Sequence, residues 1–511
     1  MTKSKSNLIK GTAILTLAGI LTRFIGFFYR IFLSNAMGAE LLGIYQLIFP
    51  VYGICFTLFA SGIQTAISTL VANEVGKKQY QNIIKILHIG ILMSAGTALV
   101  LSYFTFHYSD FIATSFLGEE QAASSVRILA IAFPFCGITA CINGYYYGLK
   151  KAGVPATTQL LEQIVRVLVV YFAASIAGGG DVKVTCDLAV LGLVFGEIAS
   201  QIYNIASMYI TPTSRAMYHL SMDNTLSQSK RTIGRQLFKI TVPLTANRLF
   251  ISILHSVEAI LIPGMLKKSG LSNSEALSVY GILTGMSIPF IMFPSAITNS
   301  LSVLLLPTIS EAQSSKNHDL ISKTTAITIK YSMLIGILSA GIFIAFGNEL
   351  GSLVYHNELA GSFLTTIAWL CPFLYITTTL SSIINGLGLA HLTFASSVIG
   401  LTMRIIIILI LVPMQGINGY LNSFLISQLI MTFFEGFIVA KRTRPPFDAL
   451  NMILKPGIII ALTCFMAKRI YEILPTDLQG ILMVLFMILG VSIASLILLG
   501  ITKAVSLKDF K

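Results

Sequence analysis

Residues 478–502 read LQGILMVLFMILGVSIASLILLGIT, a run of 25 residues without a charged side chain. About 20 apolar residues in an α-helix cross the roughly 30 Å hydrocarbon layer of a membrane. Only helices and closed barrels satisfy their backbone hydrogen bonds in lipid, and the run lacks the alternating pattern of barrel strands. Because comparable runs recur along the chain, we predict an all-α polytopic membrane protein.

Hydropathy predicts about 14 transmembrane helices. Hydrophobic residues occupy 55% of the 511 positions and charged residues 11%. In a soluble domain roughly a quarter of all residues are charged. The expected spans are 11–34, 43–73, 82–106, 126–149, 155–177, 187–210, 237–263, 277–306, 322–346, 361–387, 391–412, 416–440, 449–471 and 478–502.

The net charge of +13 comes from Lys and Arg that gather in short gaps between the apolar runs, such as Lys150–Lys151 and residues 441–444. Such clusters are typical of cytoplasmic loops. Alternate loops carry acids such as Asp110, and only Lys267–Lys268 depart from this pattern. We therefore expect a multi-pass protein of the inner (plasma) membrane with both termini in the cytoplasm, and no binding of nucleic acid.

The chain looks doubled, which predicts two pseudo-symmetric six-helix lobes followed by two extra helices. Paired repeats of this kind are common in secondary transporters. The recurring residues are Pro134, Gly148, Leu149 and Arg166, matched by Pro372, Gly386, Leu387 and Arg404. The predicted parts are an N-lobe at 1–210, a polar cytoplasmic linker at 211–236, a C-lobe at 237–440, and two further helices with a tail at 441–511.

Arginines inside two apolar segments are the leading candidates for a binding site, because a charge within a span requires a partner or a wet cavity. Arg23 and Arg30 lie seven positions apart in the first span, which places them on one helix face about 10 Å apart. Arg248, preceded by Asn247, lies in the seventh span. A guanidinium binds phosphate oxygens bidentately, so these residues predict a site for an anionic headgroup. Two alternatives are that Arg30 snorkels to the membrane surface and that Arg248 forms an ion pair with an acid such as Glu258 or Glu197.

Other charged residues within spans have competing structural and functional interpretations. Glu162 and Arg166 stand four apart with the acid first, which favours an intrahelical pair over a substrate contact. Arg404 has no such acid nearby in sequence, so it lies in a cavity or pairs across helices. Glu435 and Glu258 are candidates for coupling to Na⁺ or H⁺.

The eighth span contains Gly281, Gly285, Pro289 and Pro294. Several glycines and prolines within one span free backbone groups and permit bending. We predict that these residues form a hinge, although close packing of small residues is a competing account.

Motifs for covalent or cofactor chemistry are missing from the sequence. It contains no Walker loop, no zinc-binding histidine pair and no nucleophile elbow. The six cysteines show neither a metal-ligand spacing nor a disulfide framework. We therefore expect a protein that is not an enzyme and that uses no cofactor or metal.

Several motifs carry a family resemblance that covers nearly the whole chain. They are Lys10-Gly11-Thr12, Thr22-Arg23, Gly26-Phe27 and Arg30, then Gly43-Ile44-Tyr45, and later Tyr280 to Pro289 and Leu305-Leu306-Pro307. This combination resembles the stage V sporulation protein B group. That group belongs to the polysaccharide transporter branch of the multidrug/oligosaccharidyl-lipid/polysaccharide (MOP) superfamily, whose members include MurJ flippases.

The resemblance implies a 14-helix flippase that moves undecaprenyl-pyrophosphate-linked sugars from the inner to the outer leaflet. Arg23 matches a cavity arginine in the first helix of MurJ relatives, and Arg30 is displaced by one residue from their next arginine. Arginines of their second and eighth helices have no counterpart here, since Cys55–Phe59 and Pro289 occupy those places. This departure argues against lipid II itself as the cargo, and we hypothesise that Arg248 compensates.

We therefore expect alternating access for a lipid-linked oligosaccharide or peptidoglycan precursor, in envelope polysaccharide or spore cortex synthesis. Membrane lipid and the glycan-synthesis machinery are the expected partners. The first alternative is a cation-coupled multidrug antiporter of the same superfamily, which requires acids in the cavity. The second is a non-transporting membrane scaffold, which requires every intramembrane arginine to be paired.

Overall fold

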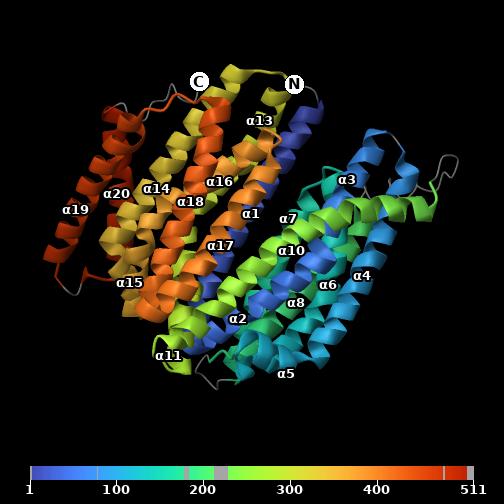
Figure 1. Cartoon of the computed structure of the whole chain (residues 1–511), viewed down its shortest axis with the longest axis horizontal. Helices are drawn as coiled ribbons and strands as arrows, with labels where there is room; N and C mark the ends of the chain where they lie inside the picture. Colours follow the sequence, from blue (N-terminus) through green and yellow to red (C-terminus); the bar gives the residue numbers. More distant parts are fainter. Residues whose placement is uncertain are drawn as a thin grey trace. The chain divides into compact units, whose positions relative to one another are not determined.

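The computed structural model describes residues 3–77, 79–177, 183–211, 228–475, 478–502 and 504, with the backbone alone for residues 3–16. Within these ranges every regular element is helical, and fourteen helices are long and apolar enough to cross a membrane (Figure 1). The predicted all-α polytopic fold is confirmed. Residues 212–227 of the predicted linker, and the predicted tail beyond residue 504, lie outside the described residues.

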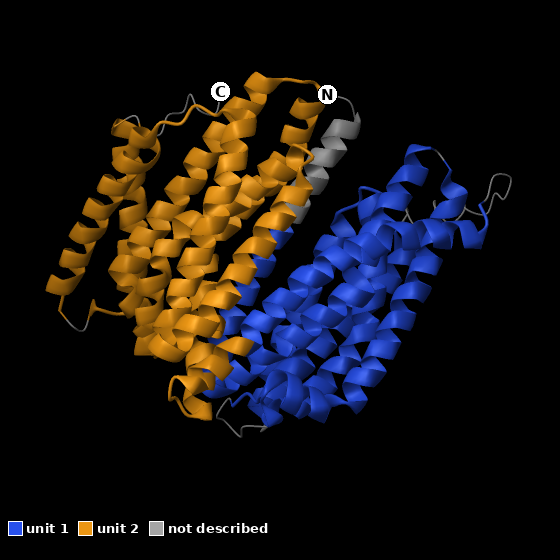
Figure 2. Ribbon diagram, in the orientation of Figure 1, with its two compact units in different colours: residues 1–260 blue, residues 261–511 orange. Residues whose placement is uncertain are grey.

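The chain forms two compact units, residues 1–260 (unit 1) and 261–511 (unit 2), which Figure 2 colours separately. The boundary falls inside helix α10 (Lys230–Lys268), so α10 begins in unit 1 and ends in unit 2. The division into lobes at 1–210 and 237–440 stays a prediction.

Helix α10 is longer than the apolar span predicted at 237–263, and it includes residues 230–236, which we predicted as part of the linker 211–236. The difference arises because hydropathy detects only the segment that lies in hydrocarbon. Basic residues such as Arg231 and Arg235 lower the hydropathy, yet arginine is a good helix former and continues the helix outside that layer.

Unit 1 is built around α6, which packs against α2, α3, α4 and α8, while α7 packs against α8 and α1. Ile67, Tyr145 and Leu237 are fully or almost fully buried in one core that joins α3, α6 and the start of α10. The helices are α1 (Lys3–Met37), α2 (Ala39–Phe56), α3 (Gly62–Gly76), α4 (Ile83–His107), the short α5 (Ser109–Phe111), α6 (Ala123–Gly148), α7 (Gly153–Ala177), α8 (Cys186–Ile210) and most of α10.

Unit 2 is built around α14, which packs against α13, α15, α16, α19 and α20, while α17 packs against α18. Ile309, Ile383 and Val439 belong to its main core. The helices are α11 (Asn273–Gly281), α12 (Ile288–Met292), α13 (Ser295–Ser314), α14 (His318–Tyr355), α15 (Glu358–Ile367), α16 (Cys371–Gly386), α17 (Ala390–Gln415), α18 (Ile417–Thr443), α19 (Lys455–Ile473) and α20 (Ile481–Ile501).

The repeated glycines serve the same packing purpose in both units. A Cβ at Gly148, the last residue of α6, would lie 2.8 Å from the carbonyl oxygen of Ser68 in α3. A Cβ at Gly386, the last residue of α16, would lie 3.1 Å from the carbonyl oxygen of Leu306 in α13. In each unit the missing side chain lets one helix approach the backbone of its neighbour.

Two long spans are interrupted by π-helical turns, which leave backbone carbonyls without their usual partners. The turn η1 (Thr57–Ser61) joins α2 to α3, and the turn η5 (Ile282–Ser287) joins α11 to α12. Side chains of neighbouring helices donate to carbonyls in or beside these turns. In unit 1, Ser94 Oγ donates to the Phe59 oxygen at 2.5 Å, and in unit 2, Tyr355 OH donates to the Met286 oxygen at 3.3 Å.

The eighth span is broken at the residues that we predicted as a hinge. The turn η5 follows Gly281 and contains Gly285, Pro289 is in the first turn of α12, and Pro294 separates α12 from α13. The predicted span 277–306 is therefore a series of short helical segments, because π turns and prolines interrupt the hydrogen-bond ladder. Movement at these breaks stays a prediction.

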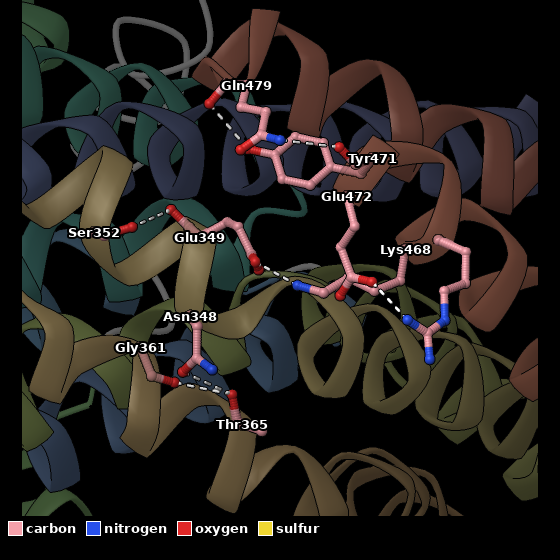
Figure 3. Close-up of polar contacts among 10 residues, drawn as sticks. Asn348, Glu349, Ser352, Gly361, Thr365, Lys468, Tyr471, Glu472 and Gln479 are labelled. Atoms are coloured by element: carbon pink, nitrogen blue, oxygen red, sulfur yellow. Dashed lines mark hydrogen bonds and ion pairs between the residues drawn. The ribbon is translucent and has the colours of Figure 1, made fainter. Parts of the chain in front are cut away.

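The last two helices, α19 and α20, lie side by side (Figure 1) and are tied to α14 by a partly buried ion pair (Figure 3). Glu349 of α14 binds the ammonium of Lys468 in α19, with side chains 22% and 24% exposed. The same ammonium lies 5.7 Å from the centre of the Phe346 ring. Tyr471 OH donates to the carbonyl oxygen of Gln479 at 2.9 Å, which joins the end of α19 to the segment before α20.

Replacing Lys468 with methionine should lower the free energy of unfolding by about 2 kcal/mol, a value between those of exposed and fully buried ion pairs. The variant leaves the Glu349 carboxylate without its cation. Thermal unfolding can be followed with a thiol-reactive dye, because all six cysteines are buried in the folded chain. The matched control is Arg469→Met, since the Arg469–Glu472 pair is exposed. Equal stability of the two variants would contradict this assignment.

Candidate functional site

Arg23 and Arg30 project from the first span with exposed side chains. Both belong to α1, a helix that packs against α7 within unit 1. Arg23 makes no hydrogen bond or ion pair with the side chains and backbone that the structure describes. A guanidinium in this state retains its donors for a ligand or for water.

Arg248 lies on α10 beside the interrupted second span, and its side chain is exposed. Its Nη1 donates to the carbonyl oxygen of Ser61, the last residue of η1, at 2.5 Å. Within the described part of the chain this is the single hydrogen bond of the guanidinium, and no carboxylate pairs with it. The alternative of an ion pair with Glu258 or Glu197 is therefore wrong, and the convergence of Arg248 with Arg23 stays a prediction.

The neighbourhood of Arg248 is set by a close approach of α10 to α3 at Gly62. A Cβ there would lie 2.0 Å from Oγ1 of Thr245 and 3.2 Å from the carbonyl oxygen of Thr241. Further along α10, Ser256 Oγ donates a hydrogen bond to the carbonyl oxygen of Pro50 in α2, at 3.3 Å. The second span and α10 are thus in contact along several turns, and Asn247 is exposed next to Arg248.

Glu258, one of the two acids considered as partners of Arg248, lies close to a histidine of its own helix. Glu258 is buried at 6% exposure, and its Oε2 lies 3.7 Å from Nδ1 of the exposed His255 on the same helix. A role of Glu258 in ion coupling stays a prediction.

A polar cluster lies in the interior of unit 1 between α2, α7 and α8. Glu162 and Arg166 of α7 form the ion pair that their spacing predicts. Tyr52 OH of α2 donates to Oε1 of Glu197 in α8 at 3.5 Å and lies 3.7 Å from the sulfur of Cys136. This cluster could not be predicted as a unit, because it joins residues of four helices, α2, α6, α7 and α8. Its one signal in the sequence was Glu197, an acid in the middle of the sixth span.

In unit 2, Arg404 is withdrawn from solvent at 7% exposure. Its Nε donates to Ser427 Oγ of α18 at 2.7 Å, and its guanidinium lies 4.3 Å from the centre of the Phe424 ring. This arrangement matches the cross-helix alternative for Arg404 rather than an open cavity.

Glu435 of α18 is buried at 1% exposure. Ser381 Oγ of α16 donates to its Oε2 at 2.8 Å. Its Oε1 has no hydrogen-bond partner, and no Lys or Arg pairs with it, among the residues that the structure describes. A buried carboxylate without a counter-charge is costly, so this position suits a proton or a small cation.

The described residues form fourteen apolar helices of membrane-spanning length, and the sequence profiles and relatives identify a polytopic transporter of the MOP superfamily. The chain belongs to the polysaccharide biosynthesis protein family, whose sequence profile matches residues 8–313. A second profile, MatE, matches residues 250–410.

Named relatives cover most of the chain. Stage V sporulation protein B of Bacillus subtilis (strain 168) is 26% identical over 440 residues, which are 86% of this chain and 84% of that protein. The lipid II flippase MurJ of the same organism is 22% identical over 461 residues, covering 86% of this chain and 83% of the flippase.

Solved structures share the fold. A lipid II flippase MurJ in an inward closed conformation superposes with a TM-score of 0.70 at 15% identity, covering 95% of this chain and 98% of that one. An inward-facing multidrug resistance MATE family transporter gives a TM-score of 0.65 at 14% identity, covering 84% and 98%.

The contact at Gly62 yields a stability prediction. Gly62→Ala should lower the free energy of unfolding by about 1–3 kcal/mol, as overpacking does, because the new methyl group meets Thr245. Thr245 Oγ1 is buried without a partner among the described residues. Adding Thr245→Ala to the Gly62→Ala variant should therefore restore much of the lost free energy of unfolding. The midpoint of thermal unfolding measures both effects.

The control for this pair is Gly96→Ala on α4, where a Cβ meets nothing within 4 Å. Alanine favours a helix over glycine, so this variant should be neutral or slightly more stable. A Gly62→Ala protein as stable as Gly96→Ala would show that α10 does not approach α3 as described.

Proposed function

We propose that the protein is a flippase that moves an undecaprenyl-pyrophosphate-linked oligosaccharide or peptidoglycan precursor from the inner to the outer leaflet of the cell membrane. The observation that carries this proposal is the exposure of the Arg23 and Arg248 side chains and their lack of a carboxylate partner within the part of the chain that the structure describes. Both are exposed on membrane spans, and neither has a carboxylate partner among the described residues. Membership of the polysaccharide biosynthesis protein family supports the same substrate class.

The physical argument concerns the cost of a charge in a span. A guanidinium at membrane depth needs a counter-charge or water, and no acid in the described part of the chain pairs with either of these two arginines. A pyrophosphate supplies that charge, and its oxygens accept the paired N–H donors of arginine. We assign Arg23, Arg248 and Arg30 to the pyrophosphate, with Asn247 as a neutral donor beside Arg248.

Movement of the headgroup between the two sides of the membrane requires spans that bend. The eighth span, broken around Gly285 and Pro294, and the π turn η1 in the second span are the candidates. Glu435 is the candidate for coupling to H⁺ or Na⁺, since its Oε1 lacks a described partner. Both termini are placed in the cytoplasm in this scheme.

A cation-coupled multidrug antiporter is the second candidate, favoured by the buried acids Glu197 and Glu435 and by the MatE profile. A binding assay separates the two functions: an antiporter binds cationic dyes, whereas the proposed flippase binds prenyl pyrophosphates. A non-transporting scaffold requires all intramembrane arginines to be paired, and Arg23, which has no partner among the described residues, speaks against it.

Arg23→Ala and Arg248→Ala should each reduce flipping at least about tenfold, because a hydrogen bond to a charged group contributes roughly 1.5–3 kcal/mol. Flipping is measured in proteoliposomes as the protection of a labelled undecaprenyl-pyrophosphate glycan from an external enzyme. The matched control is Arg127→Ala, since Arg127 is exposed and pairs with Asp110 at 3.0 Å. Full activity of both variants, with normal folding, would refute the anion site. Depletion of the protein, followed by identification of the lipid-linked sugar that accumulates, then defines the glycan.

Glu435→Gln should make flipping insensitive to an imposed proton or sodium gradient, because the amide can neither release a proton nor bind a cation by charge. The rate is compared with and without the gradient, so a general loss of activity is distinguished from a loss of coupling. Glu472→Gln on the exposed end of α19 is the control. A gradient response equal to that of the unaltered protein would exclude Glu435 from coupling.

A further inference from the structure

A groove of about 810 Å³ lies in unit 2, and none of the residues assigned to the pyrophosphate lines it. Its walls come from α14, α16 and α18, and the segment after α18 closes one end. The lining is almost entirely apolar and includes Met333, Ile376, Phe433 and Phe437. Phe433 and Phe437 are 69% and 68% exposed, so the groove presents a wide apolar surface that protein does not cover within unit 2.

The length of the groove corresponds to one membrane leaflet. It follows α18 from Thr432 to Ala440 and ends at Arg444. Twelve residues of helix rise about 18 Å, and half of a hydrocarbon layer is roughly 15 Å thick. A hydrocarbon chain of a lipid in that leaflet therefore fits along the groove with its headgroup beside Arg444.

The end of the groove is basic. Arg444 contributes to the lining, and Lys441 and Arg442 precede it in the last turn of α18. Ser322 Oγ of α14 donates to the carbonyl oxygen of Arg444 at 3.1 Å, which fixes this segment against the wall of the groove. The nearby Asp448 carboxylate accepts hydrogen bonds from the side chain and backbone N–H of Asn451, at 2.5 and 3.2 Å.

Among the described residues the guanidinium of Arg444 has no hydrogen bond or ion pair. Clusters of Lys and Arg at the cytoplasmic end of a membrane helix attract anionic lipids. A zwitterionic headgroup would bring its own cation to the three basic side chains and gain less from them. The chemistry of this end thus matches a headgroup with net negative charge.

We propose that this groove binds an anionic phospholipid of the cytoplasmic leaflet, with one acyl chain between α14, α16 and α18 and the phosphate at Arg444. The groove shares no residue with the proposed headgroup site of the transported lipid, and the proposal does not depend on the identity of the cargo. It makes membrane composition a factor in the stability of unit 2.

Tryptophan fluorescence tests the site directly, because the chain contains a single tryptophan, Trp369. In a Trp369→Phe protein, Phe437→Trp places a reporter in the groove. Phe465→Trp places the control reporter on α19, where Phe465 is 59% exposed and does not line the groove. Each protein is reconstituted in phosphatidylcholine vesicles with a fixed fraction of brominated phosphatidylglycerol or brominated phosphatidylcholine.

Brominated phosphatidylglycerol should quench Phe437→Trp at least about twofold more strongly than brominated phosphatidylcholine, and both should quench Phe465→Trp equally. Adding Lys441→Gln and Arg444→Gln should remove the preference at Phe437→Trp. Equal quenching of Phe437→Trp by the two lipids would overturn the proposal, and so would a preference that survives these two substitutions. Reversal of the quenching by a small fraction of undecaprenyl phosphate, but not by unlabelled phosphatidylglycerol, would show that the groove takes a prenyl chain and would also overturn it.

Discussion

A backbone in hydrocarbon must satisfy its own hydrogen bonds, and the architecture of this protein follows from that requirement. Continuous helices meet it within themselves, whereas the π turns η1 and η5 expose carbonyls that helices elsewhere keep occupied. Neighbouring helices supply donors to these turns, from Ser94 in one unit and Tyr355 in the other. The interruptions are thus supported by tertiary contacts, and bending at them requires those contacts to change.

Most of the fold could be predicted from the sequence, because the length and apolarity of a span depend on the local sequence alone. The predicted spans overlap the observed helices from α1 to α20. The start of α10 at Lys230 was missed, since hydropathy does not register a helix that continues into water. Gly148 and Gly386, two residues of the internal repeat, each allow a close approach of helices in their own unit, and the division into two lobes stays a prediction.

Contacts on one helix could be predicted as well, and contacts between helices could not. Spacing alone indicated the pair of Glu162 and Arg166, which the structure contains. The donation from Arg248 to the Ser61 carbonyl joins positions 187 residues apart, and no periodicity encodes such a distance. The serine beside Glu435 was hidden for the same reason, because it comes from α16.

The hydrogen bond from Arg248 to the carbonyl oxygen of Ser61 has a thermodynamic consequence. Arginine has five N–H donors, and one of them already stabilises the carbonyl at the end of η1. Any anion that draws on the same guanidinium changes the free energy of that turn, and by reciprocity the shape of the turn changes the affinity for the anion. The fraction of protein with an anion bound at Arg248 and the curvature of the second span at η1 then depend on the same equilibrium.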